Sequence, residues 1–249
     1  MAAAKRNAMK LAINCDMGES FGLYKMGDDE GMMPHITIAN IACGFHASDP
    51  SVMAHTVRLA KRHNVRVGAH PSLPDLQGFG RREMKMRPEE LTDSIVYQVG
   101  ALTGFLEREG MKLFHVKPHG SLYGMAAKSR EVAKAVADAA KVFNVPVLGM
   151  AGSMHEQVYA AEGLEFISEY YADLEYGDDG TLIITREHHA VDPKRAAERA
   201  LRAVKQGVAE SVNGNEVRVR ADCICVHSDT PNAVEVAQAV KAAVAEYLA

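Results

Sequence analysis

The chain alternates between two hydrophobic patterns from one end to the other. Short apolar runs are followed by stretches in which apolar residues recur every three or four positions, which is the spacing of a helix with one buried face. The predicted strands are 11–19, 36–46, 65–72, 111–114, 146–153, 165–173 and 221–229. Because strand and helix alternate without a linker or an internal repeat, we expect one α/β domain with a parallel sheet.

Capping residues mark where several of the predicted helices begin. Asp49-Pro50 and Asp192-Pro193 each place a capping carboxylate before a proline at the first helical position. Pro88 is expected to open a long amphipathic helix, and Thr230-Pro231 to cap the final one. A further helix is predicted over 128–141.

Polar side chains recur where the predicted strands end. In His115-Val-Lys-Pro-His119, alternation along a strand puts His115, Lys117 and His119 on one face. Other strands end on Asp16, His46, His70, His227 and Asp229. Any one residue of the His115–His119 stretch is more often a structural polar group. Seven residues at five strand ends together indicate a site, namely Asp16, His46, His70, Lys117, His119, His227 and Asp229. Seven short strands suggest a closed or nearly closed barrel, and in such barrels catalytic residues gather at the rim formed by these ends.

Two chemistries fit these residues. Histidines and carboxylates can hold a divalent metal that lowers the pKa of bound water, with Asp16, His46 and His70 as candidate ligands. Alternatively, Asp16 or a histidine acts as a base while Lys117 stabilises an oxyanion without a metal. Asp16 can equally be a turn-forming residue that caps the next segment.

A loop rich in glycine and arginine follows the third predicted strand, over residues 73–87. It is long enough to be a lid or a substrate loop, and Arg81 or Arg82 can hold a carboxylate through two hydrogen bonds, although a solvated arginine is the default. Further on, Gly152 and Ser153 can offer backbone amides to an anion or a carbonyl group.

Composition narrows the function further. The 249 residues are 47% hydrophobic with a net charge of −4, which argues against binding to nucleic acid or to a membrane surface. Residues 1–9 are polar and are expected to form a short tail before a single domain over 10–249. The four cysteines contain no C-x-x-C pair, so we expect structural thiols in a reducing cytoplasm, with zinc–thiolate binding as the alternative.

Several classes of active site have no motif in this chain. It contains no G-x-x-x-x-G-K-[ST] phosphate loop and no G-x-G-x-x-G after the first strand. We therefore expect that the chain does not bind a nucleotide unaided.

Motifs spread along the chain resemble the LamB/YcsF family, which includes the A subunit of bacterial 5-oxoprolinase. The motifs are Asn14-x-Asp16-x-Gly18-Glu19, Ala39-Asn-Ile-Ala-Cys-Gly-Phe-His46, Gly68-Ala-His-Pro-Ser72, Phe79-Gly-Arg81, His115-Val-Lys-Pro-His-Gly120 with Leu122-Tyr123, and Ala151-Gly-Ser153. The resemblance covers the chain from Lys10 to its end. It implies a single seven-stranded (β/α) barrel of the glycoside hydrolase/deacetylase type. It also implies ring opening of 5-oxoproline or a related lactam, coupled to ATP hydrolysis, with separate B and C subunits as partners.

The strand-end pattern and the resemblance together give a set of candidate roles. Asp16, Lys117 and His119 are the expected catalytic residues. The expected substrate-binding residues are Asn14, Glu19, His46, His70, Arg81, Tyr123, Ser153, His227 and Asp229. The alternatives are a stand-alone metal-dependent deacetylase or amidohydrolase, and a non-catalytic subunit that binds the lactam.

The chain departs from the family pattern at a few positions. Ser48 and Ser228 stand where the family often has glycine, and Leu174 replaces an expected arginine. Ile184-Thr185-Arg186 replaces a more usual Val-Pro-Arg. If the missing arginine normally touches the substrate, another lactam or amide is preferred; if it is structural, the substrate is unchanged.

Overall fold

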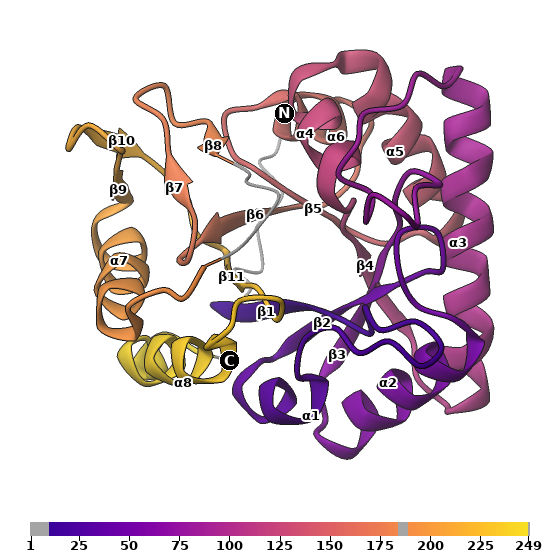
Figure 1. Cartoon of the computed structure of the whole chain (residues 1–249). Helices are drawn as coiled ribbons and strands as arrows, with labels where there is room; N and C mark the ends of the chain where they lie inside the picture. The colour runs from indigo at the N-terminus through magenta and orange to yellow at the C-terminus, as the bar shows by residue number, and fades with distance from the viewer. Residues whose placement is uncertain (1–9, 184–188, 249) are drawn as a thin grey trace.

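Seven parallel strands close into a barrel at the centre of the molecule (Figure 1). The computed structural model describes residues 10–183 and 189–248. The barrel strands are β1 (Ala12–Met17), β2 (Ile38–Ala42), β3 (Arg66–His70), β4 (Leu113–Val116), β5 (Val147–Gly149), β6 (Phe166–Tyr171) and β11 (Cys223–Val226). They run in the order β1-β11-β6-β5-β4-β3-β2, so β1 closes the barrel by pairing with both β2 and β11. Each predicted strand overlaps one barrel strand, and the predicted seven-stranded barrel is confirmed.

Helices surround the barrel (Figure 1). They are α1 (Asp29–Met32), α2 (Pro50–Arg62), α3 (Pro88–Arg108), α4 (Gly120–Lys128), α5 (Arg130–Phe143), α6 (Met154–Ala161), α7 (Pro193–Gln206) and α8 (Ala233–Ala243), with 3-10 turns at Met33–His35 and Ala245–Tyr247. Among the described residues, no helix combines the length and the apolar character needed to cross a membrane.

The capping predictions are confirmed at two helices and wrong at the last one. The Asp49 carboxylate accepts hydrogen bonds from the amides of Ser51 and Val52, and Asp192 caps α7 in the same way. In contrast, α8 begins at Ala233, after Asn232. The Ala233 amide donates to the Thr230 carbonyl at 3.0 Å, so Thr230-Pro231 belong to a turn before the helix.

Two antiparallel hairpins interrupt the βα alternation, and neither was predicted. One consists of β7 (Glu175–Tyr176) and β8 (Leu182–Ile183), and the other of β9 (Val208–Glu210) and β10 (Glu216–Arg218). Their strands are only two or three residues long, which is too short for a period-two pattern to stand out. The predicted tail and Ile184-Thr185-Arg186 lie outside the described residues.

The barrel interior is apolar at one end and polar at the other. Its apolar end is filled by Ala12, Ile38, Leu148, Ile167 and Cys223. Further along β1, Asn14 and Asp16 share the inward face with Ala12, as period-two alternation requires. A Cβ on Gly68 would lie 1.9 Å from His115 Cε1, so a glycine in β3 makes room for that imidazole.

Candidate functional site

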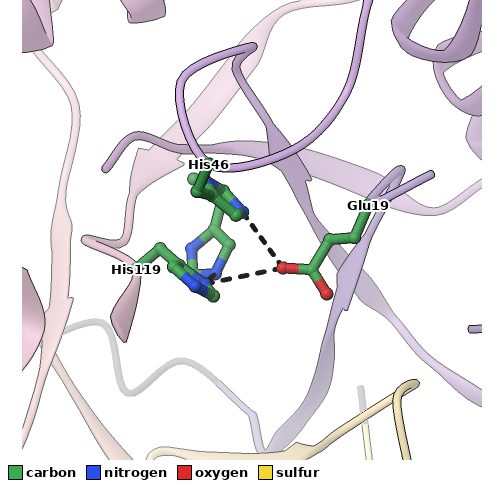
Figure 2. A group of neighbouring side chains, drawn as sticks. Glu19, His46 and His119 are labelled. Carbon is green, nitrogen blue, oxygen red and sulfur yellow. Dashed lines mark hydrogen bonds and ion pairs between the residues drawn. The ribbon is translucent and has the colours of Figure 1, made fainter. Parts of the chain in front are cut away.

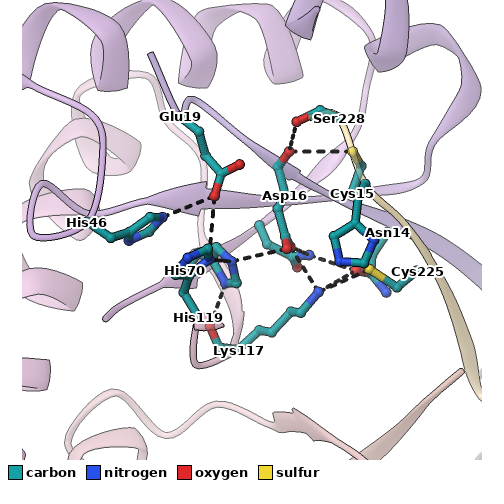
Figure 3. A network of polar contacts seen from close by, with 12 residues as sticks. Asn14, Cys15, Asp16, Glu19, His46, His70, Lys117, His119, Cys225 and Ser228 are labelled. Atoms are coloured by element: carbon teal, nitrogen blue, oxygen red, sulfur yellow. Dashed lines mark hydrogen bonds and ion pairs between the residues drawn. The ribbon is translucent and has the colours of Figure 1, made fainter. Parts of the chain in front are cut away.

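Lys117, directly after β4, extends its ammonium into the barrel. Its Nζ lies 2.9 Å from Asp16 Oδ1, 2.8 Å from Glu169 Oε1 and 3.2 Å from Cys225 Sγ (Figure 3 shows the Asp16 and Cys225 contacts). The side chain is only 2% exposed. Burial alone would lower the pKa of Lys117, but the surrounding groups, Asp16 foremost, raise it well above its usual value. Lys117 therefore remains a buried cation.

Asp16 is the anion that connects Lys117 to the histidines. Its Oδ1 accepts hydrogen bonds from Lys117 and, at 2.8 Å, from Asn40 Nδ2, while Oδ2 lies 3.2 Å from His70 Nε2. Burial alone would raise the pKa of this carboxyl, but His70 and Lys117 outweigh it and hold the pKa well below its usual value. Asn14 contacts the Lys117 ammonium as well, since its Oδ1 lies 3.3 Å from Lys117 Nζ.

Glu169 in β6 is a member of this network that the sequence analysis missed. It is buried, forms the second ion pair of Lys117 and accepts a hydrogen bond of 2.7 Å from the Tyr171 hydroxyl. A signal was available, because Ile167, Glu169, Tyr171 and Asp173 alternate along the predicted sixth strand. A carboxylate on the inward face of an apolar strand is costly to bury without a cation.

Glu19, His46, His70 and His119 form a second buried cluster beside this network. Figure 2 shows Glu19 facing the rings of His46 and His119. Glu19 Oε1 lies 3.1 Å from His46 Nε2 and 3.5 Å from His119 Nδ1, and His70 Nε2 lies 2.9 Å from His119 Nδ1. One donor atom from each of the four residues lies within 4.8 Å of all the others, so this group could hold a metal ion.

The electrostatics of this cluster differ from those around Lys117. Burial, reinforced by Asp16 and Asp229, raises the pKa of Glu19 well above its usual value. Burial, followed by the neighbouring imidazoles, lowers the pKa values of His46 and His119 well below theirs. Both effects arise because charged forms are poorly solvated here.

The glycine-rich loop closes over the histidines through the turn Phe79-Gly80. Phe79 and Gly80 both have positive φ, of 53° and 63°, and the Phe79 carbonyl lies 2.8 Å from His119 Nε2. A Cβ on Gly80 would lie 2.2 Å from Ser72 Oγ and 2.9 Å from His119 Cδ2. The loop predicted as a lid or substrate loop therefore packs directly against the cluster, and only glycine fits at position 80.

His227 and Asp173 form a third charged group on the rim. Nδ1 of His227 lies 3.1 Å from both carboxylate oxygens of Asp173, which also accepts the His227 amide at 2.7 Å. Burial alone would lower the pKa of His227, but Asp173 outweighs it and raises the pKa to about 9. Asp173 was not singled out from the sequence, although it shares the inward alternation of Glu169.

A small cavity of about 40 Å³ lies above these groups. Most of the predicted site residues line it, namely Asp16, Glu19, His70, Arg81, Lys117, His119, Tyr123, His227 and Asp229. Arg81 and Asp229 pair with each other at 2.7 Å. Asn14 and His46 do not line the cavity but contact residues that do.

Ser153 is placed differently from the other predicted site residues. It lines a separate cleft of about 560 Å³ that also touches Arg81 and Tyr123. Its side chain caps α6 by accepting from the His155 amide, and the Gly152 amide donates to Glu156 at 3.0 Å. The Gly152 amide is therefore already paired with a carboxylate.

The departures from the family pattern fall around the same rim. The Ser228 hydroxyl donates to the Asp16 carbonyl at 2.8 Å. Ser48 adopts a φ of 74°, in the region that favours glycine. Leu174 lines the small cavity, and its carbonyl accepts a hydrogen bond from Arg199.

All four cysteines are free and buried. Cys225 accepts from Lys117, and Cys223 accepts from the side-chain Nδ2 of Asn14 at 2.9 Å. The prediction of structural thiols agrees with these contacts.

Comparison with known proteins agrees with the motifs. The model of the LamB/YcsF family matches residues 11–248. A lactam utilization protein, LamB, of Emericella nidulans is 47% identical over 99% of this chain and 98% of its own. The A subunit of 5-oxoprolinase from Bacillus licheniformis is 48% identical over 92% of each chain. The crystal structure of a lactam utilization protein from Thermus thermophilus superposes with a TM-score of 0.89 at 44% identity, covering 96% of this chain and 97% of that one. The chain therefore belongs to the LamB/YcsF family.

Proposed function

We propose that the chain hydrolyses the ring amide of 5-oxoproline or a related lactam, as the A subunit of an enzyme that couples the reaction to ATP hydrolysis. In this reaction water adds to the carbonyl carbon, the ring C–N bond breaks, and the nitrogen takes up a proton to become the amine. The names of the relatives support the substrate class, since they are a lactam utilization protein and A subunits of 5-oxoprolinase. We place the reaction in the cytoplasm, in keeping with four free, buried cysteines.

The observation that carries the proposal is the contact between Lys117 and Asp16 beneath the cavity, with Nζ and Oδ1 2.9 Å apart. A buried ammonium can polarise the amide carbonyl, or its phosphorylated form, through preorganised charge. A carboxylate with a low pKa remains ionised and can accept a proton from water as a general base. His119 is linked to Asp16 through His70.

His227 supplies the remaining proton in this proposal. Asp173 keeps its imidazole protonated near neutral pH, and His227 lines the same cavity as Lys117. An imidazolium at that position can donate a proton to the departing ring nitrogen.

The ATP dependence is assigned to the complete enzyme rather than to this chain alone. The sequence has no phosphate-loop motif, so the proposal assigns nucleotide handling to the complex with the B and C subunits. A relative whose name makes it one subunit of 5-oxoprolinase supports a multi-subunit enzyme.

The proposal is tested by assaying glutamate formation from 5-oxoproline with the purified chain, with and without ATP and with and without the B and C subunits. We expect product only with all of them present, and a rate that falls more than about tenfold for Asp16→Asn. Product without ATP or partners would instead indicate a stand-alone amidohydrolase. Binding of 5-oxoproline without turnover, even in the complete mixture, would indicate a non-catalytic binding subunit.

A further inference from the structure

We propose that Glu19, His46, His70 and His119 bind one divalent transition-metal ion, for which zinc has the best-matched ligand preferences. Zinc binds imidazole nitrogens and carboxylate oxygens, whereas calcium and magnesium prefer sites made of oxygen ligands. The inference concerns the same rim as the proposed reaction but does not depend on it.

The tautomer of His70 is set by a hydrogen bond that it makes outside the cluster. Its Nδ1 lies 2.8 Å from the Lys117 backbone carbonyl. A carbonyl oxygen can only accept, so Nδ1 carries the hydrogen. In the neutral ring, Nε2 then presents a bare lone pair to the inside of the cluster.

The tautomer of His119 is set by an equivalent hydrogen bond outside the cluster. Its Nε2 lies 2.8 Å from the Phe79 carbonyl, so this nitrogen carries the hydrogen and Nδ1 is bare. His70 Nε2 and His119 Nδ1 are only 2.9 Å apart. Because both outer nitrogens carry hydrogens, this contact needs either a second proton on His70 Nε2, which also lies 3.2 Å from Asp16 Oδ2, or a metal ion between the two nitrogens.

The outer hydrogen bonds of His70 and His119 match those of metal-binding histidines. Such histidines commonly donate their second ring N–H to a carbonyl or carboxylate, which fixes the tautomer and the orientation of the ring. The Phe79 carbonyl is brought to His119 by the positive-φ turn Phe79-Gly80, which the packing tolerates only with glycine at position 80.

The other donors converge on the same place. Glu19 Oε1 lies 3.1 Å from His46 Nε2, and the rings of His46 and His119 stack with centroids 3.8 Å apart. A proton on His70, paired with Asp16, is the competing occupant, and it accounts for the contact of His70 with His119. One metal ion accounts for the convergence of all four donor atoms.

A second candidate set, formed by Asp16, Cys225 and His227, is excluded by its contacts. The three donor atoms also lie within 4.8 Å of one another. However, the ammonium of Lys117 is already bound to Asp16 and Cys225, and a metal ion there would face a fixed positive charge. The two sets therefore divide the rim between a resident ammonium and a metal ion.

Three of the proposed ligands, Glu19, His70 and His119, line the small cavity. When bound there, a divalent metal supplies Lewis-acid polarisation of a carbonyl or lowers the pKa of a bound water. Asp16, 3.2 Å from His70, is then a neighbour of the ion rather than one of its ligands.

The test is metal binding by the full-length chain, without lactam, ATP or partner subunits. Metal-stripped protein is titrated with zinc chloride by calorimetry and with cobalt(II) followed by visible absorption. We expect one equivalent to bind, and His119→Ala and His46→Ala each to weaken zinc binding more than about tenfold. The matched control, His63→Ala, removes an exposed histidine and is expected to leave the affinity unchanged.

X-ray absorption at the zinc edge keeps the inference testable if a variant fails to fold. On the wild-type chain we expect three imidazole ligands and one carboxylate oxygen. The inference is overturned if neither ion binds with a 1:1 stoichiometry, or if the first shell contains sulfur from Cys225. Metal binding without ring opening of 5-oxoproline would count against the proposed reaction alone.

Discussion

Two neighbouring clusters on one barrel rim differ in how their buried polar groups are paired. Around Lys117, every strong charge has a partner of opposite sign within 3 Å, namely Asp16 on one side and Glu169 on the other. In the cluster of Glu19, His46, His70 and His119, one carboxylate and three imidazoles converge instead, with the ring nitrogens of His70 and His119 2.9 Å apart.

The network around Lys117 contains its own cation, the Lys117 ammonium. The histidine cluster gains a cation only when a proton or a metal ion binds. The network around Lys117 is complete as folded, so its charges can be permanent and preorganised. The histidine cluster is complete only with an added proton or metal ion. We therefore expect loss of the Lys117 cation to destabilise the first network, and binding of a cation to stabilise the histidine cluster.

The largest effect is expected from Lys117→Ala, which removes the resident cation. Glu169 would lose its buried ion-pair partner, and Asp16 would lose the same cation but keep its contact with His70, so we expect a loss of about 3–5 kcal/mol in the free energy of unfolding. The rate of lactam opening should fall more than about tenfold. Urea unfolding and the glutamate assay measure the two effects.

The control for this variant is Lys134→Ala on α5, which removes an exposed ion pair with Asp138. It should change the unfolding free energy by less than about 0.5 kcal/mol. Near-wild-type stability of Lys117→Ala would show that the network around Lys117 is not held together by charge.

The next effect concerns pH, through His227 and Asp173. The pKa of His227 is about 9 in the folded chain, against an ordinary value of 6.5, so folding favours its protonated form. The pair's contribution, about 3 kcal/mol, is complete below about pH 6.5 and is lost as the pH rises through about 9. Asp173→Asn should remove this dependence.

Unfolding free energies of the wild type and Asp173→Asn, compared from pH 6 to 10, isolate the pair from other titrating groups. The gap between the two proteins should narrow across this range. A gap that stays constant with pH would mean that Asp173 acts only through its hydrogen bond to the His227 amide.

A smaller effect is expected from Gly80→Ala, which sharpens the account of the histidine cluster. The new Cβ would meet Ser72 and His119, and the residue would retain a positive φ. The control is Gly163→Ala, because Gly163 also has positive φ but has nothing within 4 Å of an added Cβ. Backbone strain is thus common to both variants, and only Gly80→Ala adds overpacking.

We expect Gly80→Ala to cost roughly 1–3 kcal/mol more than Gly163→Ala in unfolding free energy. It should also weaken zinc binding about tenfold, because the carbonyl that fixes His119 is displaced. If the two variants have the same unfolding free energy and the same zinc affinity, the turn Phe79-Gly80 does not support the histidine cluster.

The smallest effect is expected from Ser153→Ala, which removes the side-chain cap of α6. A loss of about 1 kcal/mol in unfolding free energy is typical of such a cap. The control is Ser129→Ala, which removes the equivalent cap of α5. If Ser153 acts only as a cap, the two variants will share the same KM for the lactam. A raised KM in Ser153→Ala alone would support the sequence-based role in substrate binding.

The barrel and the meeting of the rim residues were predictable from the sequence, because both follow from alternation. Short apolar runs between amphipathic helices specify the barrel, and polar residues at their ends converge wherever parallel strands share a rim. Asp16, Lys117, His70 and His119 meet for this reason, while their roles in catalysis remain predictions. The same alternation also places Glu169 on the inward face of its strand, although Glu169 was not predicted as a site residue.

Other features depend on backbone conformation that no local pattern specifies. The Phe79 carbonyl reaches His119 because two successive residues adopt positive φ, and phenylalanine is not a residue that signals this conformation. The pairing of the Gly152 amide with Glu156 likewise depends on how the turn before α6 folds.

The size of the small cavity has a consequence for turnover. A volume of about 40 Å³ has room for only a few water molecules. A five-membered ring cannot occupy it as it stands. Leu174 and Leu182, on either side of the hairpin loop between β7 and β8, are the two leucines among the described residues of its wall. For the proposed reaction, we therefore expect this part of the wall to move before a lactam ring can enter and the open-chain product can leave, and we expect that movement to limit turnover.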